Sequence, residues 1–198
     1  MSHVSWETRY QSGPRLFSGE PNPTLVAETA RLRAGRALDV GCGEGGDAIW
    51  LAERGWQVTA IDIAPTALRR AARENPAAAE RVTWLECDIT HDSLPSGPFD
   101  LVTMHYIPLL TRDADGVLPG VLSTVAPGGI FLFVTHDLDD LAVRGDFDPR
   151  DYCQPGDVAE RLGPEWTVTA QRKRRGNGRA DPATTHTHDA ILSATRSG

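Results

Sequence analysis

The chain has 198 residues, of which 40% are hydrophobic and 24% charged, and its formal net charge is −7. This length suffices for one domain with a substantial core, and we take residues 1–198 as a single domain. The net negative charge argues against binding to nucleic acid over a large surface, because basic residues supply most of the affinity for nucleic acid. No apolar run is long enough for a transmembrane helix, the polar N-terminus does not look like a signal peptide, and the scattered cysteines have neither disulfide nor metal spacing. We therefore expect a cytoplasmic protein without a membrane partner or a metal.

The pattern of apolar residues predicts an α/β fold. The opening residues include Trp6 and Tyr10, at the i, i+4 spacing of one helix face. From residue 36 on, short apolar runs alternate with helical patterns, which is typical of a parallel sheet covered on both faces. Strands are expected at 36–40, 56–62, 81–88, 99–106 and 130–137, and helices at 24–32, 46–55, 65–74, 109–124 and 155–163. Two final strand-like segments, 165–174 and 184–196, flank turn residues and predict an antiparallel hairpin.

A glycine-rich turn follows the first strand, in the stretch ALDVGCGEGGD at 37–47. Its glycines satisfy the dinucleotide-binding pattern, in which a helix N-terminus holds a pyrophosphate. Here, however, Asp39, Glu44 and Asp47 surround the turn and no basic residue lies in it, so an anion would meet like charge. A cationic ligand reverses the sign, and S-adenosylmethionine carries both a sulfonium and an ammonium group. The turn favours that cofactor, while NAD and a ligand-free turn stay open as alternatives.

Two further acidic residues end the next two predicted strands. Asp62 lies about 20 residues after the glycines, where a carboxylate grips a ribose diol. Asp88 is placed to accept a hydrogen bond from an adenine amino group, with the backbone of Ile89 beside it. Because the carboxyl ends of parallel strands meet at one edge, we expect these acids and Asp39 to form a row over one crevice.

At this point the sequence resembles the class I S-adenosylmethionine-dependent methyltransferases. The matching pieces, in family order, are LDVGCGEGGDAIWLAERGWQVTAIDIAPTAL, LECDI, FDLV and LSTVAPGGIFLF. The opening WETRY…SGEPNPTL looks like the small-molecule subset related to tellurite-resistance and thiopurine methyltransferases. The resemblance implies a Rossmann-like three-layer sandwich with a seven-stranded, mostly parallel sheet of order 3-2-1-4-5-7-6 and an antiparallel C-terminal hairpin. It also implies that residues 1–33 form a helical lid and that 34–198 form the cofactor-binding core and the substrate rim.

The same resemblance assigns the cofactor, S-adenosyl-L-methionine, and its product, S-adenosyl-L-homocysteine. Asp39 would face the ammonium group, Asp62 the ribose and Asp88 the adenine, while the segment 104–106 would lie under the transferred methyl. The residues expected at the cofactor are Trp6, Tyr10, Asp39, Gly41, Cys42, Gly43, Asp62, Ile63, Asp88, Ile89 and His105.

Histidines gather on the predicted substrate side. Methyl transfer requires alignment and exclusion of water, and a hard nucleophile also needs a base. His105 and His136 end two strands, and His186 and His188 begin the antiparallel last strand, which reaches the same rim. His105, His136 and His188 are therefore candidate catalytic residues, or else simply hydrogen-bonding wall residues. A zinc site at these histidines is a minor alternative, because the reaction needs no metal.

Two features have open roles. Trp6 and Tyr10 either anchor the N-terminal segment or roof the site, where an aromatic face stabilises a sulfonium through a cation–π contact. The basic cluster at 172–179 is either a solvated loop or a contact for an anionic substrate. MHYIPL, after the fourth strand, lacks the Asn/Asp-Pro-Pro-aromatic element of enzymes that methylate amino groups of DNA and RNA.

We predict a methyltransferase, monomeric or homodimeric, that acts on a small-molecule acceptor and not on nucleic acid. The alternatives are an NAD-dependent oxidoreductase and a non-catalytic S-adenosylmethionine-binding protein. The sequence leaves the acceptor atom open among sulfur, selenium, tellurium, oxygen and nitrogen.

Overall fold

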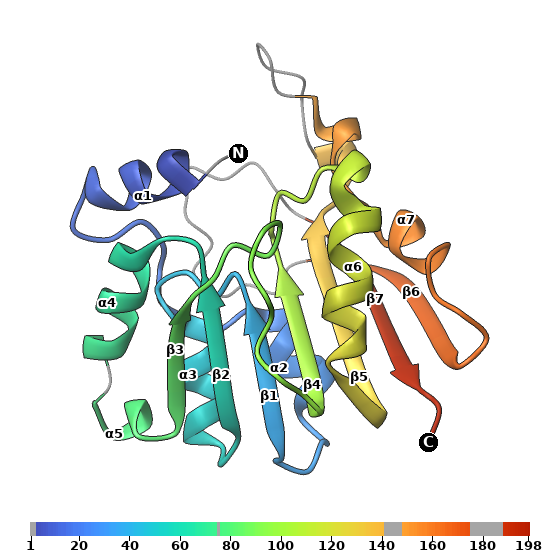
Figure 1. Cartoon of the computed structure of the whole chain (residues 1–198), viewed down its shortest axis with the longest axis horizontal. Coiled ribbons are helices and arrows are strands. Elements are labelled where there is room, and N and C mark those ends of the chain that lie inside the picture. Colours follow the sequence, from blue (N-terminus) through green and yellow to red (C-terminus); the bar gives the residue numbers. More distant parts are fainter. Residues whose placement is uncertain (1–2, 75, 141–147, 175–187) are drawn as a thin grey trace.

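A seven-stranded sheet of order β3-β2-β1-β4-β5-β7-β6 forms the centre of the molecule (Figure 1). The computed structural model describes residues 3–74, 76–140, 148–174 and 188–198. The strands are β1 (Arg36–Val40), β2 (Gln57–Asp62), β3 (Val82–Glu86), β4 (Phe99–His105), β5 (Val125–His136), β6 (Trp166–Arg174) and β7 (His188–Arg196). The first five pair in parallel, and β7 runs antiparallel between β5 and β6. The predicted order and terminal hairpin are confirmed.

Helices cover both faces of this sheet. They are α1 (His3–Gln11), α2 (Pro23–Thr29), α3 (Gly46–Glu53), α4 (Pro65–Glu74), α5 (Pro76–Ala79), α6 (Ala114–Ser123) and α7 (Pro155–Ala159). In the view of Figure 1, α2 and α3 lie behind the sheet and α6 lies in front of it. The short helix α5 was not expected from the sequence, and the helix expected at 109–124 begins with a separate 3-10 turn, Thr111–Asp113.

Local sequence signals set where the helices begin. The Asn22 side chain caps α2 by accepting a hydrogen bond from the Thr24 amide at 2.8 Å, and Pro23 occupies the first helical position. Gly45 enters α3 with a left-handed φ of 84°, and Pro65 begins α4. These positions agree with the breaks expected between the apolar runs.

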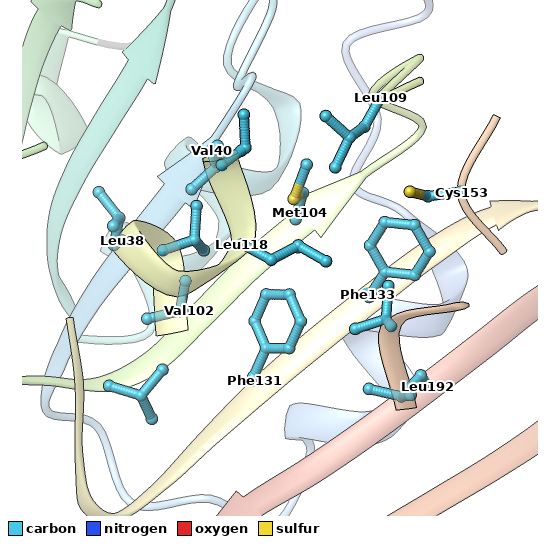
Figure 2. Packing of buried hydrophobic residues seen from close by; sticks show 14 of the residues in the cluster. Leu38, Val40, Val102, Met104, Leu109, Leu118, Phe131, Phe133, Cys153 and Leu192 are labelled. Carbon is cyan, nitrogen blue, oxygen red and sulfur yellow. The ribbon is translucent and has the colours of Figure 1, made fainter. Parts of the chain in front are cut away.

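The core is built from alternate residues of the strands. Figure 2 shows one half of it, in which Leu38, Val102 and Phe131 of the strands lie close to Leu118 of α6. The other half packs on the opposite face, where strand residues such as Leu101 meet α3. Because side chains alternate along a strand, this arrangement decides which side chains face α3 near the end of each strand.

That alternation brings polar residues of β1 and β4 together. Asp39 pairs with Thr103 in the parallel register of these two strands. His105 lies two residues beyond Thr103 and so shares its face, which is the face that α3 covers. The carboxyl ends of the parallel strands thus carry a polar group on the α3 side.

Two sequence expectations need adjustment at the C-terminal side. β5 begins at Val125, before the Pro127–Gly129 turn that was expected to precede it, and its pairing with β4 is irregular between Phe99 and Leu101. Most of the basic cluster at 172–179 and His186 lie outside the described residues. Within the described part, no helix is long and apolar enough to cross a membrane.

Candidate active site

The glycine turn between β1 and α3 has the strained backbone that only glycine adopts readily. Gly41 and Gly43 have φ values of 69° and 54°, in the left-handed region. A Cβ atom on Gly41 would lie 2.6 Å from Cδ1 of Ile107, and one on Gly43 would lie 3.0 Å from the Tyr10 hydroxyl. Both positions therefore require glycine for two reasons: the left-handed backbone conformation and the close approach of a neighbouring side chain.

Asp62, at the end of β2, holds this turn in place. Its Oδ2 accepts a hydrogen bond from the Gly43 amide and its Oδ1 one from the Ala64 amide, both at 2.8 Å. Burial raises the pKa of this carboxyl, although hydrogen bonds from backbone amides oppose the shift. Each carboxylate oxygen has a second acceptor position, so the side chain can still receive hydroxyl donors from a ligand.

A buried polar cluster lies on the α3 side of the turn. Oδ1 of Asp39 accepts a hydrogen bond from the Thr103 hydroxyl at 2.8 Å, whereas Oδ2 is buried and has no partner among the described residues. Burial, together with the negative charge of Asp47, raises the pKa of Asp39 to about 7, although His105 and Thr103 oppose the shift. A carboxylate buried without a cation carries a large desolvation cost, which a positively charged ligand would offset.

His105, the last residue of β4, joins the same cluster. Its Nδ1 lies 2.7 Å from Oδ2 of Asp47 in the first turn of α3, and its side chain is only 6% exposed. Nε2 of His105 is buried and has no hydrogen-bond partner within the described part of the chain. The other oxygen of Asp47 accepts the backbone N–H of Asn22 at 2.5 Å. Asp47, a residue not assigned a role of its own from the sequence, thus connects β4 with the N-terminal segment.

Glu44 does not contribute negative charge to the ligand side, contrary to the expectation from the sequence. Its carboxylate is buried and forms an ion pair with Arg70 of α4 at 2.9 Å. It also accepts the backbone N–H groups of Leu16 and Phe17 at 3.0 and 2.9 Å. The negative character of the turn therefore rests on Asp39 and Asp47, since Arg70 neutralises Glu44.

The N-terminal segment packs directly on the glycine turn. Tyr10 is 3% exposed and forms a small apolar cluster with Ala64, just before α4, and Ala67, in its first turn, and Trp6 packs against that cluster. The Tyr10 hydroxyl is the group next to Gly43, and burial raises the pKa of that hydroxyl. Arg9 lies over the Trp6 ring at 4.5 Å from its centroid. One face of Trp6 therefore already has a cation, whereas Tyr10 lies at the turn itself.

Asp88 follows β3 and is more exposed than the other acids. It accepts hydrogen bonds from the amide and the hydroxyl of Thr90 at 2.9 and 2.5 Å, and His91 lies 3.2 Å away. Partial burial raises the pKa of Asp88, but these hydrogen bonds outweigh it and the net shift is downward. A local turn thus fixes the orientation of this carboxylate.

Two further candidate histidines, His136 and His188, lie at the ends of β5 and β7. The His136 ring stacks on Tyr106 with 4.5 Å between ring centroids. The Tyr106 hydroxyl donates to the buried carboxylate of Asp189 at 2.8 Å, and Tyr106 has a left-handed φ of 52°, which is uncommon for a bulky residue. His188 lies 3.4 Å from Asp140. The sequence did not indicate Tyr106 or Asp189 individually, because their contact spans 83 positions.

The structure therefore brings Tyr10, Asp39, the glycines, Asp62 and His105 to one place, with His136 and His188 on its β5–β7 side. Two surface hollows, of about 450 and 380 Å³, lie elsewhere, one beside α6 and the other between α2 and α3. At the turn itself, Tyr10 and Ile107 fill the space next to the glycines. Among the described residues, no group of three or more acidic, histidine or cysteine side chains has metal-site geometry.

This sheet order, with a glycine turn at the end of β1 and buried acids beside it, defines a Rossmann-like methyltransferase. Residues 37–129 match the family model described as a methyltransferase domain. Over 166 residues the chain is 32% identical to a 2-heptyl-1-hydroxyquinolin-4(1H)-one methyltransferase of Mycobacteroides abscessus, covering 78% of this chain and 69% of that protein. It is 31% identical over 117 residues to a malonyl-[acyl-carrier protein] O-methyltransferase of Enterobacter lignolyticus, covering 59% of this chain and 45% of that one.

A solved structure shows the same fold. The N-methyltransferase NodS of Bradyrhizobium japonicum, in complex with S-adenosyl-L-homocysteine, superimposes with a TM-score of 0.70 at 19% identity, covering 100% of this chain and 99% of that one. The chain belongs to the methyltransferase domain family and is an S-adenosylmethionine-dependent methyltransferase. This result decides against an NAD-dependent oxidoreductase.

Proposed function

We propose that this methyltransferase moves the methyl group of S-adenosyl-L-methionine to a small-molecule acceptor by in-line displacement. The observation that carries the proposal is the buried Asp39 carboxylate, whose Oδ2 is unpartnered among the described residues, beside a turn that requires glycine. A buried acceptor of this kind fits an ammonium group and is mismatched to a phosphate. When bound, the cofactor supplies an electrophilic methyl group on a sulfonium.

The chain's own residues then bind and orient the two reactants. Asp39 holds the ammonium end, and the backbone at Gly41, Cys42 and Gly43 supports the cofactor. Asp62 and Ile63 bind the ribose, while Asp88 and Ile89 bind the adenine.

Residues 1–33 act as a lid in this proposal, with Tyr10 closing the turn and Trp6 supporting it. The ion pair between Arg70 and Glu44 supports this role, because Arg70 also donates to the carbonyl oxygens of Tyr10 and Gly13. A closed lid excludes water from the reacting atoms, which strengthens electrostatic interactions inside the site.

The acceptor binds against the stacked rings of Tyr106 and His136, with His188 farther along the same side. An aromatic wall of this kind suits a planar acceptor. The name of one relative points the same way, since that protein is a 2-heptyl-1-hydroxyquinolin-4(1H)-one methyltransferase. The resemblance of the opening segment to the tellurite-resistance and thiopurine subset also favours a small acceptor.

A methyl-transfer screen tests the proposal. The protein is incubated with cofactor carrying a labelled methyl group and with panels of thiols, phenols, nitrogen heterocycles and oxyanions, with bulk tRNA as a separate arm. We expect label in at least one small acceptor together with stoichiometric S-adenosyl-L-homocysteine. Label in tRNA alone, or cofactor binding without transfer to any acceptor, would contradict the proposal.

A further inference from the structure

Three buried side-chain polar atoms lack hydrogen-bond partners within the described residues: Oδ2 of Asp39, Nε2 of His105 and Nε1 of Trp84. The first two belong to the neighbouring strands β1 and β4, whereas Trp84 lies on β3. The side chains of Asp39 and His105 lie on the sheet face that α3 covers, because Asp39 pairs with Thr103 and His105 follows two residues later. Asp47 also lies close enough to Asp39 to raise its pKa. Buried polar atoms without hydrogen-bond partners are rare in folded proteins, and a bound ligand is one way in which such atoms are satisfied.

The contact with Asp47 decides what His105 presents to a ligand. An ionised carboxylate only accepts hydrogen bonds, so Nδ1 of His105, 2.7 Å from Oδ2 of Asp47, carries the proton. In the neutral ring the other nitrogen, Nε2, then has a free lone pair and acts as an acceptor. With Asp39 ionised and the ring of His105 neutral, the cluster offers one charged and one neutral acceptor.

We propose that His105 and Asp39 together form the acceptor pair that holds the primary ammonium group of the cofactor's methionine moiety, and that Asp47 serves as a positioning residue by fixing the tautomer of His105. This inference rests on the proposed orientation of the cofactor. A primary ammonium has three N–H donors and a positive charge, so it matches two acceptors in a buried acidic cluster.

Two other roles for His105 fit the structure less well. A general base has to reach the acceptor molecule, but Nε2 of His105 is buried, and Nδ1 is already engaged by Asp47. A buried water bridging the two atoms would satisfy their hydrogen bonding but would leave the negative charge of the cluster uncompensated.

The test compares two ligands that differ only in the amino group. Calorimetry measures binding of S-adenosyl-L-homocysteine and of its deaminated analogue, in which hydrogen replaces that amino group, to the full chain and to two variants. His105→Leu removes the acceptor, whereas His105→Gln keeps an amide N–H for Asp47 and a carbonyl oxygen for the ligand. Because the deaminated analogue lacks the ammonium, it is the control for folding and for every other contact.

A charge-assisted hydrogen bond is worth about 1.5–3 kcal/mol, so we expect His105→Leu to weaken S-adenosyl-L-homocysteine binding about tenfold to a hundredfold. Binding of the deaminated analogue should change less than about threefold, and His105→Gln should recover most of the lost affinity. Equal losses for both ligands would overturn the inference, as would unchanged cofactor affinity with a loss confined to turnover, which is the mark of a base.

Asp47→Asn tests the positioning role separately. An amide at this position can donate to Nδ1 and allow the tautomer with the proton on Nε2, which would point a donor at the ammonium. We expect a selective loss of affinity for the amino-bearing ligand, and this loss should largely vanish in the His105→Leu background. A loss that persists there would refute the role of Asp47 through His105. Failure of the unmodified protein to bind S-adenosyl-L-homocysteine at all would instead contradict the cofactor assignment.

Discussion

The Glu44 carboxylate and the Arg70 guanidinium form an ion pair at 2.9 Å, with side chains 4% and 25% exposed. Glu44 accepts two backbone amides of the N-terminal segment, and Arg70 donates to the carbonyl oxygens of Tyr10 and Gly13. The Glu44–Arg70 ion pair therefore anchors the N-terminal segment at two places. Glu44, in the glycine turn, holds residues 16–17, and Arg70, in α4, holds residues 10–13. The pair lies deep enough that removal of one partner leaves a buried charge unsatisfied.

Arg70→Leu should lower the free energy of unfolding by about 2–4 kcal/mol, because removal of one partner of a buried pair strands the other. The segment 3–17 should also become more susceptible to limited proteolysis. Chemical denaturation and mass spectrometry of the digest measure the two effects. Arg15→Ala is the matched control, since it breaks an exposed ion pair with Glu74 and should cost less than about 1 kcal/mol. If the two variants lower the free energy of unfolding equally, the buried Glu44–Arg70 pair stabilises the protein no more than the exposed pair does.

The raised pKa of Asp39 predicts how stability depends on pH. Its folded pKa, about 7, lies above its ordinary value of 3.8, so the folded protein binds a proton that the unfolded chain releases. The contribution of Asp39 to stability is therefore greatest below pH 4 and declines as the pH rises to about 7. Asp39→Asn should remove this decline and make the ligand-free protein more stable near pH 8. Thermal unfolding of both proteins from pH 5 to 8 measures the difference, and parallel pH profiles would disprove the assignment.

Ligand binding should show the opposite pH trend for the same residue. An ammonium group needs the ionised form of Asp39, so affinity for S-adenosyl-L-homocysteine should rise with pH through about 7. Calorimetry in two buffers of different ionisation enthalpy should then detect proton release on binding near pH 6. No dependence of the measured enthalpy on the buffer would contradict this.

Two reasons for glycine at position 43, the close approach of Tyr10 and the left-handed backbone, can be distinguished by their effects on stability. Gly43→Ala and Gly128→Ala both place a side chain at a left-handed φ, 54° and 76°, but only at Gly43 does the new Cβ meet another group, the Tyr10 hydroxyl at 3.0 Å. We expect about 1–2 kcal/mol of destabilisation for Gly128→Ala from conformation alone. Gly43→Ala should cost more and should also weaken cofactor binding. Urea denaturation and calorimetry measure both, and equal stability losses with intact binding would contradict the role of this contact.

Tyr106 links the end of β4 to β7 through its hydroxyl. Tyr106→Phe removes the donor to the buried Asp189 at 2.8 Å and keeps the ring that stacks on His136. Loss of a hydrogen bond to a buried carboxylate should destabilise the protein by about 1–3 kcal/mol, with little change in cofactor affinity. Denaturation and calorimetry check the two parts, and a cofactor affinity that falls in proportion to stability would place Tyr106 on the cofactor side instead.

The sequence predicted the sheet order and most elements because these depend on local periodicity and on a resemblance carried by contiguous motifs. Strand β1 and helix α4 were predicted to the residue, since a glycine turn and a proline mark their ends. The partners of the charged residues could not be predicted in this way. Glu44 and Arg70 are 26 positions apart and Asp47 and His105 are 58 apart, and no local pattern records such contacts. For this reason Glu44 was assigned to the ligand, while Asp47 appeared only as one charge among several.

Asp47 receives the amide of Asn22 on one oxygen and the imidazole of His105 on the other. A single carboxylate therefore joins the segment that precedes α2 to the last residue of β4. Displacement of the Asn22 amide would leave Oδ1 of Asp47 without this donor, and the orientation of the carboxylate towards His105 would then depend on fewer contacts.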